Sequence, residues 1–312
     1  MKAKVKRMRG VITSLAAGVT TAMIGAGARA EELMGQPTPG GMGLQPAASP
    51  LKHSAIFFHD AVLLPIITVI SLFVLGLLIW VTVRYNKRAN PVPAKWSHNT
   101  AIEIAWTLVP VLILVVIAVF SFRLLFQYND MPKPDLTVKA TGYQWYWGYE
   151  YPDQKVAEIT STMLPEDELA ARGLPHSLYR LAATEPMVVP VNKVVRVQIT
   201  AVDVIHSFAL PAFGLKTDAM PGRLNETWFK AEKVGTYYGQ CSELCGVDHA
   251  FMPIEIKVVS QPEFDAWVAS KAPPPAPAEA PAEGAAPAAT PALTPTAAPA
   301  APAAGPAPAA KL

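Results

Sequence analysis

The sequence predicts a membrane α-helical hairpin followed by an all-β sandwich or barrel domain. Two apolar runs without a charged residue, 61–83 and 104–122, are each long enough to cross the roughly 30 Å core of a bilayer as a helix. Residues 131–271 instead show the alternation of half-buried strands. The composition agrees, because 51% of the 312 residues are apolar and only 16% are charged, below the roughly 25% typical of soluble domains.

The first thirty residues have the pattern of a cleaved secretory signal. Six basic residues and no acidic residue flank a short apolar stretch, and Ala28-Arg29-Ala30 forms a cleavage site before Glu31. A first membrane anchor is the alternative, but residues 11–26 are short for a span and rich in small residues. We therefore expect residues 1–30 to be removed and residues 31–55 to form an N-terminal segment on the outer side.

The predicted hairpin covers residues 56–130 and has both of its ends on the outer side. Pro65 and Pro110 do not exclude its helices, because membrane-spanning helices tolerate proline. The loop between the runs, residues 84–103, carries basic side chains at Arg84, Lys87, Arg88 and Lys95. Such loops stay on the cytoplasmic side, and an exported N-terminus requires the same topology. A buried soluble hairpin is disfavoured, because two charge-free runs follow one another.

Residues 131–271 form the only segment that can fold as a soluble domain. Turn signals such as Pro152-Asp153 and Pro221-Gly222 separate its apolar stretches, and helical patterning is thin. We expect an antiparallel β sandwich or barrel. The clearest strand patterns are at 136–140, 194–200 and 254–259, and the helical ones at 164–171 and 263–271.

The rest of the composition excludes several classes of protein. Two cysteines are too few for the disulfide framework of a small secreted protein, and no repeat of 20–50 residues is present. The absence of a Cys-x-x-Cys-His sequence excludes a covalent c-type haem. In the last segment, 272–312, 31 of 41 residues are Ala or Pro, which predicts a disordered tail that cannot bury a core.

One loop of twelve residues concentrates four metal donors: Cys241, Cys245, His249 and Met252. Two cysteines in an exported domain usually form a disulfide, which is the simplest interpretation of the pair alone. The spacing Cys-x3-His-x2-Met, however, matches the donors that a cupredoxin copper site takes from its last loop. Such a site needs a second histidine from an upstream strand, and His206 follows a predicted strand. A structural histidine is the alternative for that position.

The second cysteine distinguishes this loop from a mononuclear blue-copper site, which uses one. Two thiolates can bridge two copper ions, and the remaining donors then divide between the metals. Rigid soft ligands that share an electron rearrange little on transfer, so the loop indicates an electron carrier rather than a hydrolase. Zinc is the competing metal, and both the thioether and the order of the donors disfavour it. The sequence therefore predicts a cupredoxin-like domain.

Four motifs in this domain carry a family resemblance. They are Gly-Tyr-Gln-Trp-Tyr-Trp-Gly-Tyr-Glu-Tyr from Gly142, Asp-Val-Ile-His-Ser-Phe from Asp203, Gly-Leu-Lys-Thr-Asp-Ala-Met-Pro-Gly-Arg-Leu-Asn from Gly214, and Gly-Gln-Cys-Ser-Glu-Leu-Cys-Gly-Val-Asp-His-Ala-Phe-Met-Pro from Gly239. Together with the export signal and the hairpin, residues 31–271 resemble subunit II of the CuA-containing bacterial haem–copper cytochrome c oxidases. The Ala/Pro tail lies outside the resemblance.

The resemblance implies a role for individual positions. Trp145 is similar to the tryptophan through which the electron from cytochrome c enters, and Glu103 to a glutamate near the cytoplasmic mouth of a proton path into subunit I. The side chain of Glu243 is similar to one that reaches a magnesium ion shared with subunit I. The implied ligands of the two CuA copper ions are His206, Cys241, Cys245, His249, Met252 and the backbone carbonyl of Glu243, with the cysteines as bridges.

Each of these roles has a plainer alternative. Trp145 lies in an aromatic-rich strand whose rings can be ordinary core residues. Thr100-x-x-Glu103 is a capping box at the start of a helix, a role compatible with proton uptake. Glu243 can be a solvated loop carboxylate.

The charge of the exported domain indicates the partner. Residues 131–270 contain 12 basic and 17 acidic residues, although the whole chain has a formal charge of +2. An acidic face steers a basic partner, and a lysine-ringed cytochrome c is such a partner. Plain solubility is the alternative for any single acid. The candidate docking residues are Glu150, Asp153, Glu158, Asp203 and Asp248.

The resemblance implies an oxidase subunit that is inactive alone. It would take electrons from cytochrome c and pass them to haem in subunit I, where oxygen is reduced to water and protons are pumped. The expected setting is the bacterial inner membrane, with subunits I and III as partners, no haem in this chain and no nucleic acid. A copper-delivery or thiol-redox protein is one rival, although no βαβ pattern supports it. A membrane-anchored structural domain with a Cys241–Cys245 disulfide is the other.

Overall fold

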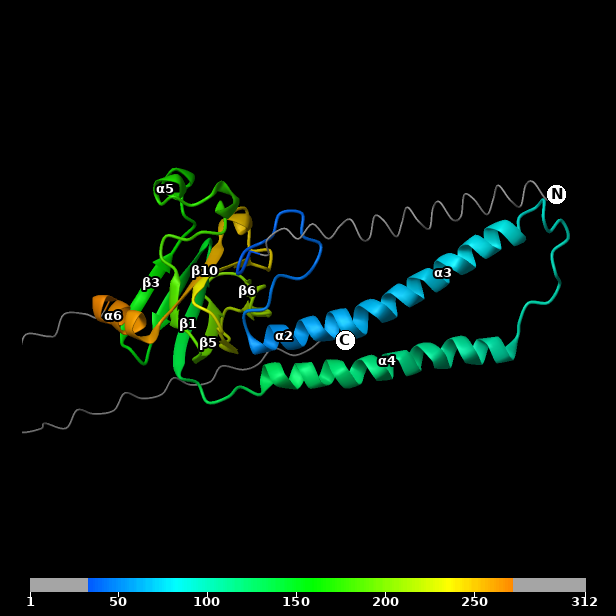
Figure 1. The fold of residues 1–312 in the computed structure, drawn as a ribbon, viewed down its shortest axis with the longest axis horizontal. Helices are drawn as coiled ribbons and strands as arrows, with labels where there is room; N and C mark the ends of the chain where they lie inside the picture. The colour runs from blue at the N-terminus through cyan, green and yellow to red at the C-terminus, as the bar shows by residue number, and fades with distance from the viewer. Residues whose placement is uncertain (1–32, 272–312) are drawn as a thin grey trace, which may run out of the picture. The chain divides into compact units, whose positions relative to one another are not determined.

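The computed structural model describes residues 33–271. The predicted signal peptide and the predicted Ala/Pro tail lie outside the described residues. The part that is described contains two long helices and a β domain (Figure 1).

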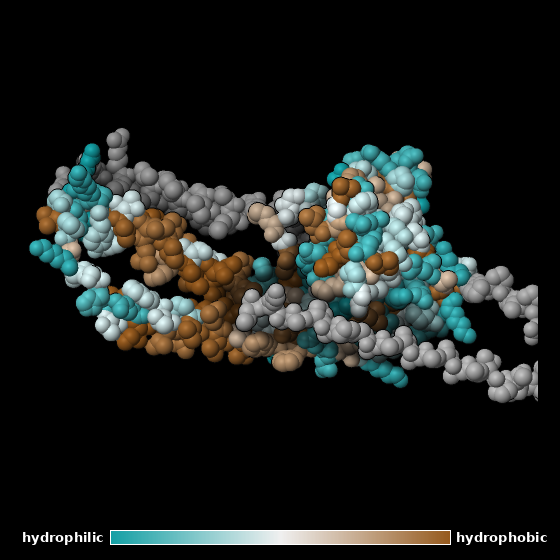
Figure 2. All heavy atoms as spheres, turned by 180° about the vertical axis from the view of Figure 1, so that it is seen from behind, coloured by the Kyte–Doolittle hydropathy of each residue, from teal (hydrophilic) through white to brown (hydrophobic). Residues whose placement is uncertain are grey.

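The hairpin consists of two helices that are longer than the predicted spans. The first is continuous through α2 (Pro50–Phe57), the π-helical turn η1 (Phe58–Leu63) and α3 (Leu64–Arg84), and the second is α4 (Thr100–Asn129). They have 35 and 30 residues, and each contains an 18-residue stretch, of mean hydropathy 2.9 in the first and 2.8 in the second, that is not buried in the chain. Figure 2 shows hydrophobic residues gathered along both helices. Such surfaces need lipid or partner helices around them.

Proline and capping residues set the local details of the hairpin. Pro65 lies in the first turn of α3, directly after the π-helical turn, while Pro110 lies inside α4. The predicted capping box is displaced by one residue, because the helix N-cap is Asn99 and not Thr100. The Asn99 side chain accepts a hydrogen bond from the Ile102 backbone N–H at 3.2 Å, and Glu103 accepts one from the Asn99 backbone N–H at 3.3 Å. Asparagine is an equally strong cap, so the helix begins one position earlier.

The β domain is a sandwich of two five-stranded sheets that share one hydrophobic core. The first sheet has the order β3 (Val156–Ser161), β2 (Tyr146–Tyr151), β1 (Leu136–Tyr143), β5 (Val194–Ala201) and β8 (Asn225–Lys230). The second has the order β4 (Met187–Pro190), β10 (Pro253–Val259), β9 (Gly235–Cys241), β6 (His206–Leu210) and β7 (Leu215–Ala219).

The sandwich is mixed and not purely antiparallel as predicted. Strands β1 and β5 pair in parallel, as do β10 and β4, while the other pairs are antiparallel. The reason is the connection from β3 to β4, which passes through α5 (Glu166–Ala171) and η2 (His176–Leu178) and moves the chain into the second sheet. The chain then returns to the first sheet beside β1. A sequence pattern fixes which residues are buried, but not the direction of the neighbouring strand.

Strand alternation is confirmed where the sequence predicted it. In β5 the buried positions are Val195, Val197, Ile199 and Ala201, of which the first three are fully buried, and the residues between them are partly exposed. Each such side chain contributes about 1.5–3 kcal/mol on burial. The helix α6 (Gln261–Lys271) begins two residues before the prediction and covers one end of the core through Phe264.

The segment before the first helix packs on the β domain, which the sequence did not predict. Tyr238 donates its backbone N–H to Gly35, and Ala48 forms backbone hydrogen bonds with Ala212 and Glu232. The Ser49 hydroxyl donates to the Phe213 carbonyl at 2.8 Å. These contacts attach the N-terminal flank of the hairpin to the β domain.

Candidate metal centre

His206 is the first residue of β6 and its ring is fully buried. The ring fits against β1 because Gly142 has no side chain; a Cβ there would lie 2.8 Å from Cδ2 of the ring. On another side, Trp147 packs edge-on against the ring, with 6.1 Å between centroids. These contacts fix the direction in which the imidazole points.

The other predicted donors lie on the segment between β9 and β10. Cys241 is the last residue of β9, and the chain then passes Cys245 and the short helix η3 (His249–Phe251) before Met252. The Cys241 backbone N–H donates to the Met252 carbonyl at 3.0 Å, so the two ends of the loop are held side by side. Both cysteines and Met252 are buried. The pairing of β9 with β10 therefore holds the two ends of the loop together.

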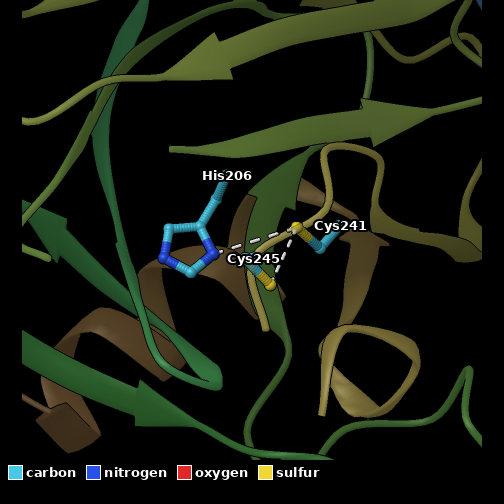
Figure 3. A group of neighbouring side chains, drawn as sticks. All are labelled: His206, Cys241 and Cys245. Atoms are coloured by element: carbon cyan, nitrogen blue, oxygen red, sulfur yellow. Dashed lines mark hydrogen bonds between the residues drawn. The ribbon is translucent and has the colours of Figure 1, made fainter. Parts of the chain in front are cut away.

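The side chains of His206, Cys241 and Cys245 converge on one point. Their donor atoms all lie within 4.8 Å of one another (Figure 3). Nδ1 of His206 is 3.9 Å from Sγ of Cys241, which is 3.9 Å from Sγ of Cys245. Sγ of Cys245 lies 3.5 Å from Nδ1 of His249, and Sγ of Cys241 lies 3.3 Å from the Glu243 carbonyl oxygen. The donors therefore form two halves, each with one imidazole facing one sulfur.

Asp203 holds the ring of His206 from behind. Its Oδ1 lies 2.8 Å from Nε2 of His206, while its Oδ2 accepts the Gln144 backbone N–H at 2.7 Å. The ring is thus fixed with Nδ1 towards the sulfurs. A carboxylate behind a histidine ligand orients the ring and raises its basicity. The sequence analysis assigned Asp203 only to docking, although the Asp-x-x-His spacing could have indicated this contact.

Electrostatics favour a thiolate at Cys241 over one at Cys245. Burial alone would raise the pKa of Cys241, but the hydrogen bond with His206 lowers it. Burial and the neighbouring Cys241 raise the pKa of Cys245. Burial alone would lower the pKa of His206, whereas its contacts with Cys241 and Asp203 raise it. Two thiolates this close repel each other, so a bound cation is needed to hold both charges.

The donor set fits a soft transition metal. Both thiols are free, so the disulfide alternative is not realised in this structure. Two thiolates, two imidazoles, a buried thioether and a carbonyl suit copper, whereas a structural zinc site uses four donors and seldom a thioether. The residues present can therefore hold the two copper ions expected from the sequence.

Trp145 is partly buried at the edge of the core and lies against the segment 241–252, called the metal loop below. Its Nε1–H donates to the Cys245 carbonyl at 3.2 Å, and the same oxygen accepts from the Gln144 side chain at 2.9 Å. A Cβ on Gly246 would lie 2.9 Å from the Trp145 ring. The neighbouring Trp147, by contrast, is fully buried. Sequence alternation could not single out Gln144, because a loop contact leaves no periodic pattern.

The candidate docking acids have different environments. Glu150 forms an ion pair with Lys139 at 3.1 Å, and Glu158 accepts a hydrogen bond from the Tyr143 hydroxyl at 2.9 Å. Asp153 and Asp248 are exposed. The Glu243 side chain is also exposed, so it can reach a group outside this chain.

Glu103 is far along the chain from the metal loop. It lies in the first turn of α4, a helix of 30 residues whose length is about 45 Å. The structure therefore does not bring Glu103 together with the predicted metal donors.

A membrane hairpin and a β sandwich with a buried Cys/His cluster define an anchored, cupredoxin-like metal-binding protein. A family model for the periplasmic domain of cytochrome c oxidase subunit II matches residues 136–259, and one for its transmembrane domain matches residues 37–124. The chain belongs to the cytochrome c oxidase subunit II family. It is accordingly a membrane subunit of an oxidoreductase complex, with a periplasmic C-terminal domain.

Individual relatives agree with the family assignment. The chain is 54% identical over 236 residues to the probable cytochrome c oxidase subunit 2 of Rickettsia bellii, covering 76% of this chain and 86% of that protein. It is 48% identical over 250 residues to cytochrome c oxidase subunit 2 of Cereibacter sphaeroides, covering 76% and 82%. The crystal structure of the periplasmic domain of subunit II of Bradyrhizobium japonicum has 60% identity and a TM-score of 0.41, covering 45% of this chain and 96% of that one.

Proposed function

We propose that this chain binds two copper ions in a binuclear CuA centre, accepts electrons from cytochrome c and passes them to haem in subunit I. Oxygen reduction and proton pumping then occur in the partner. The ligands are His206, Cys241, Cys245, His249, Met252 and the carbonyl of Glu243.

The observation that carries this proposal is the division of the donors into two halves. Nδ1 of His206 faces Sγ of Cys241 at 3.9 Å, and Nδ1 of His249 faces Sγ of Cys245 at 3.5 Å. A mononuclear site would need only one sulfur. Two sulfurs 3.9 Å apart, each with its own imidazole, suit two metals that share both thiolates.

Burial and strand anchoring support electron transfer at this site. The copper pair supplies a one-electron redox couple when it is bound. The chain keeps water away through Trp147, which is fully buried against the His206 ring, and Phe208, which is fully buried against Trp147. Ligands held on strand ends change little between oxidation states, which keeps the reorganisation small.

The remaining assignments belong to the same proposal. Trp145 receives the electron, and its hydrogen bond to the Cys245 carbonyl supports a direct path to a bridging ligand. The acids Glu150, Asp153, Glu158 and Asp248 attract the basic donor, with Asp203 contributing charge beside them. The Glu243 side chain takes part in the magnesium site, and Glu103 lies at a proton path into subunit I. The setting is the bacterial inner membrane, reached after cleavage of the N-terminal signal.

The test is copper quantification and electron-spin spectroscopy on the purified oxidase. Replacing Cys245 by Ser is expected to remove two copper ions per complex together with the mixed-valence signal of a delocalised pair. A matched Ser242→Ala variant should retain both. Loss of one copper, or of none, would contradict a binuclear centre.

A further inference from the structure

The guanidinium group of Arg180 lies over two aromatic rings. Its Cζ is 4.5 Å from the centroid of the Phe251 ring and 5.3 Å from that of the Tyr179 ring. A cation over the face of a ring is attracted by its quadrupole. Phe251 belongs to η3 and lies between the proposed ligands His249 and Met252. The contact with Arg180 therefore acts on the part of the loop that bears those two donors.

The backbone of Arg180 is itself fixed to the strand that leads into the metal loop. Its carbonyl accepts a hydrogen bond from the Gln240 side chain at 3.3 Å, and Gln240 directly precedes Cys241. Arg180 adopts a φ of 67°, which is unusual for a residue with a side chain. Neighbouring residues of this segment, Leu178 and Ala182, are buried in a small cluster with Tyr238 of β9. The backbone that carries the guanidinium is thus held by β9.

We propose that Arg180 is a positioning residue for the metal loop. By covering Phe251 it fixes η3, and with it the imidazole of His249 and the thioether of Met252. This inference rests on the proposed copper function. It gives the connection between β3 and β4 a role in holding the copper ligands in place, although no residue of that connection is a proposed ligand.

The plainer alternative is a surface arginine whose contact with Phe251 has no effect on the site. A planar, delocalised guanidinium stacks on a ring in a way that lysine does not reproduce. Arg180→Gln removes both the charge and the stacking, whereas Arg180→Lys keeps the charge. Phe251→Leu removes the ring, and Phe251→Tyr restores it. Arg172 is the matched control, because it lies in the same connection and pairs with Glu168 at 3.6 Å.

The experiment measures copper release from the purified oxidase into a chelator, together with the electron-spin spectrum. Arg180→Gln is expected to release copper about two- to fivefold faster, the range of an exposed cation–π contact. It should also alter the copper hyperfine pattern. Arg180→Lys should fall between it and wild type, and Phe251→Tyr should be near wild type. The double variant Arg180→Gln/Phe251→Leu should be no faster than Phe251→Leu alone, because the two changes remove one interaction.

The outcomes separate this inference from the proposed function. Wild-type oxidase without the mixed-valence copper signal would contradict the function itself. If that signal is present but Arg180→Gln releases copper at the wild-type rate, the positioning role is wrong. Equal acceleration by Arg172→Gln, or additive effects in the double variant, would also overturn it. Thermal unfolding of each variant shows whether a change in release comes from global destabilisation.

Discussion

Asp203 and His206 are joined by a contact of 2.8 Å between Oδ1 and Nε2. It leaves Nδ1 of the same ring facing Cys241. The carboxylate also accepts the backbone N–H groups of Gln144 and Val204, at 2.7 Å each. Although burial alone would raise its pKa, these hydrogen bonds lower it, so Asp203 stays charged. A residue first assigned to docking is therefore part of the support of the proposed copper site.

Replacing Asp203 by Ala is expected to weaken copper binding by about 10- to 100-fold, the usual effect of losing a carboxylate behind a histidine ligand. Asp203→Asn should have a smaller effect, since its side-chain oxygen can still accept from Nε2. Chelator competition on the purified oxidase measures the affinity. Asp167→Ala, an exposed acid of α5, is the control. Equal affinity in Asp203→Ala and wild type would refute the supporting role.

Gly142 allows the close packing of the His206 ring on β1. Replacing it by Ala puts a Cβ 2.8 Å from Cδ2 of the ring, so the ring must move. Overpacking of this kind costs about 1–3 kcal/mol. We expect Gly142→Ala to lower copper occupancy and the midpoint of thermal unfolding together. Gly43→Ala meets no atom within 4 Å and should change neither. Unchanged copper occupancy in Gly142→Ala would show that the position of the His206 ring does not limit copper binding.

The exposed acids Asp153 and Asp248 offer the cleanest test of electrostatic docking, because Asp203 cannot be changed without disturbing His206. Each reversal to Lys is expected to raise the KM for cytochrome c about two- to fivefold at low ionic strength. The effect should shrink at high salt because exposed charges are screened. Steady-state kinetics at two salt concentrations measure it, with Asp167→Lys as control. Equal losses at both concentrations would argue against steering.

Substitution of Trp145 tests the proposed electron transfer without removing a proposed copper ligand. Trp145→Phe keeps an aromatic ring but loses the Nε1–H donor to the Cys245 carbonyl. We expect reduction of the copper centre by cytochrome c to slow at least about tenfold, equal to about 1.4 kcal/mol of barrier. The copper content and spectrum should stay the same, because Trp145 is not a ligand. Stopped-flow reduction measures the rate, and Trp267→Phe is the control. A normal rate would remove Trp145 from the path.

Several parts of the fold could be predicted because they depend on local patterns. Charge-free runs predicted both helices, and alternation predicted the buried face of β5. The parallel pairing of β1 with β5 could not be predicted, because it depends on which sheet the chain enters after an irregular insertion. The packing of the N-terminal segment around Ala48 on the β domain could not be predicted for a similar reason, because backbone hydrogen bonds between distant segments leave no periodic signal in the sequence.

For the candidate site, too, the features set by local sequence could be predicted and the contacts between distant segments could not. Residue types and spacing alone predicted five candidate donors, since the chemistry resides in the side chains: His206, Cys241, Cys245, His249 and Met252. The Glu243 carbonyl was implied only by the family resemblance. The residues that hold those donors could not be predicted. Gly142, Gln144 and Arg180 act through contacts between segments far apart in the chain. Each becomes evident only when β1, the β3–β4 connection and the metal loop are brought together.

Glu103 has one observed role, capping α4, and one proposed role, proton uptake, which one pair of substitutions can separate. Its Oε1 accepts the Asn99 backbone N–H at 3.3 Å, so it helps to cap α4. Glu103→Gln keeps a carbonyl oxygen for that hydrogen bond but cannot carry a proton. If Glu103 serves proton uptake, Gln and Ala should slow steady-state turnover equally while copper content stays constant. If it only caps the helix, Gln should restore turnover and Ala should lower stability by about 0.5–2 kcal/mol, as loss of a cap does. Turnover and thermal unfolding of both variants decide between the two.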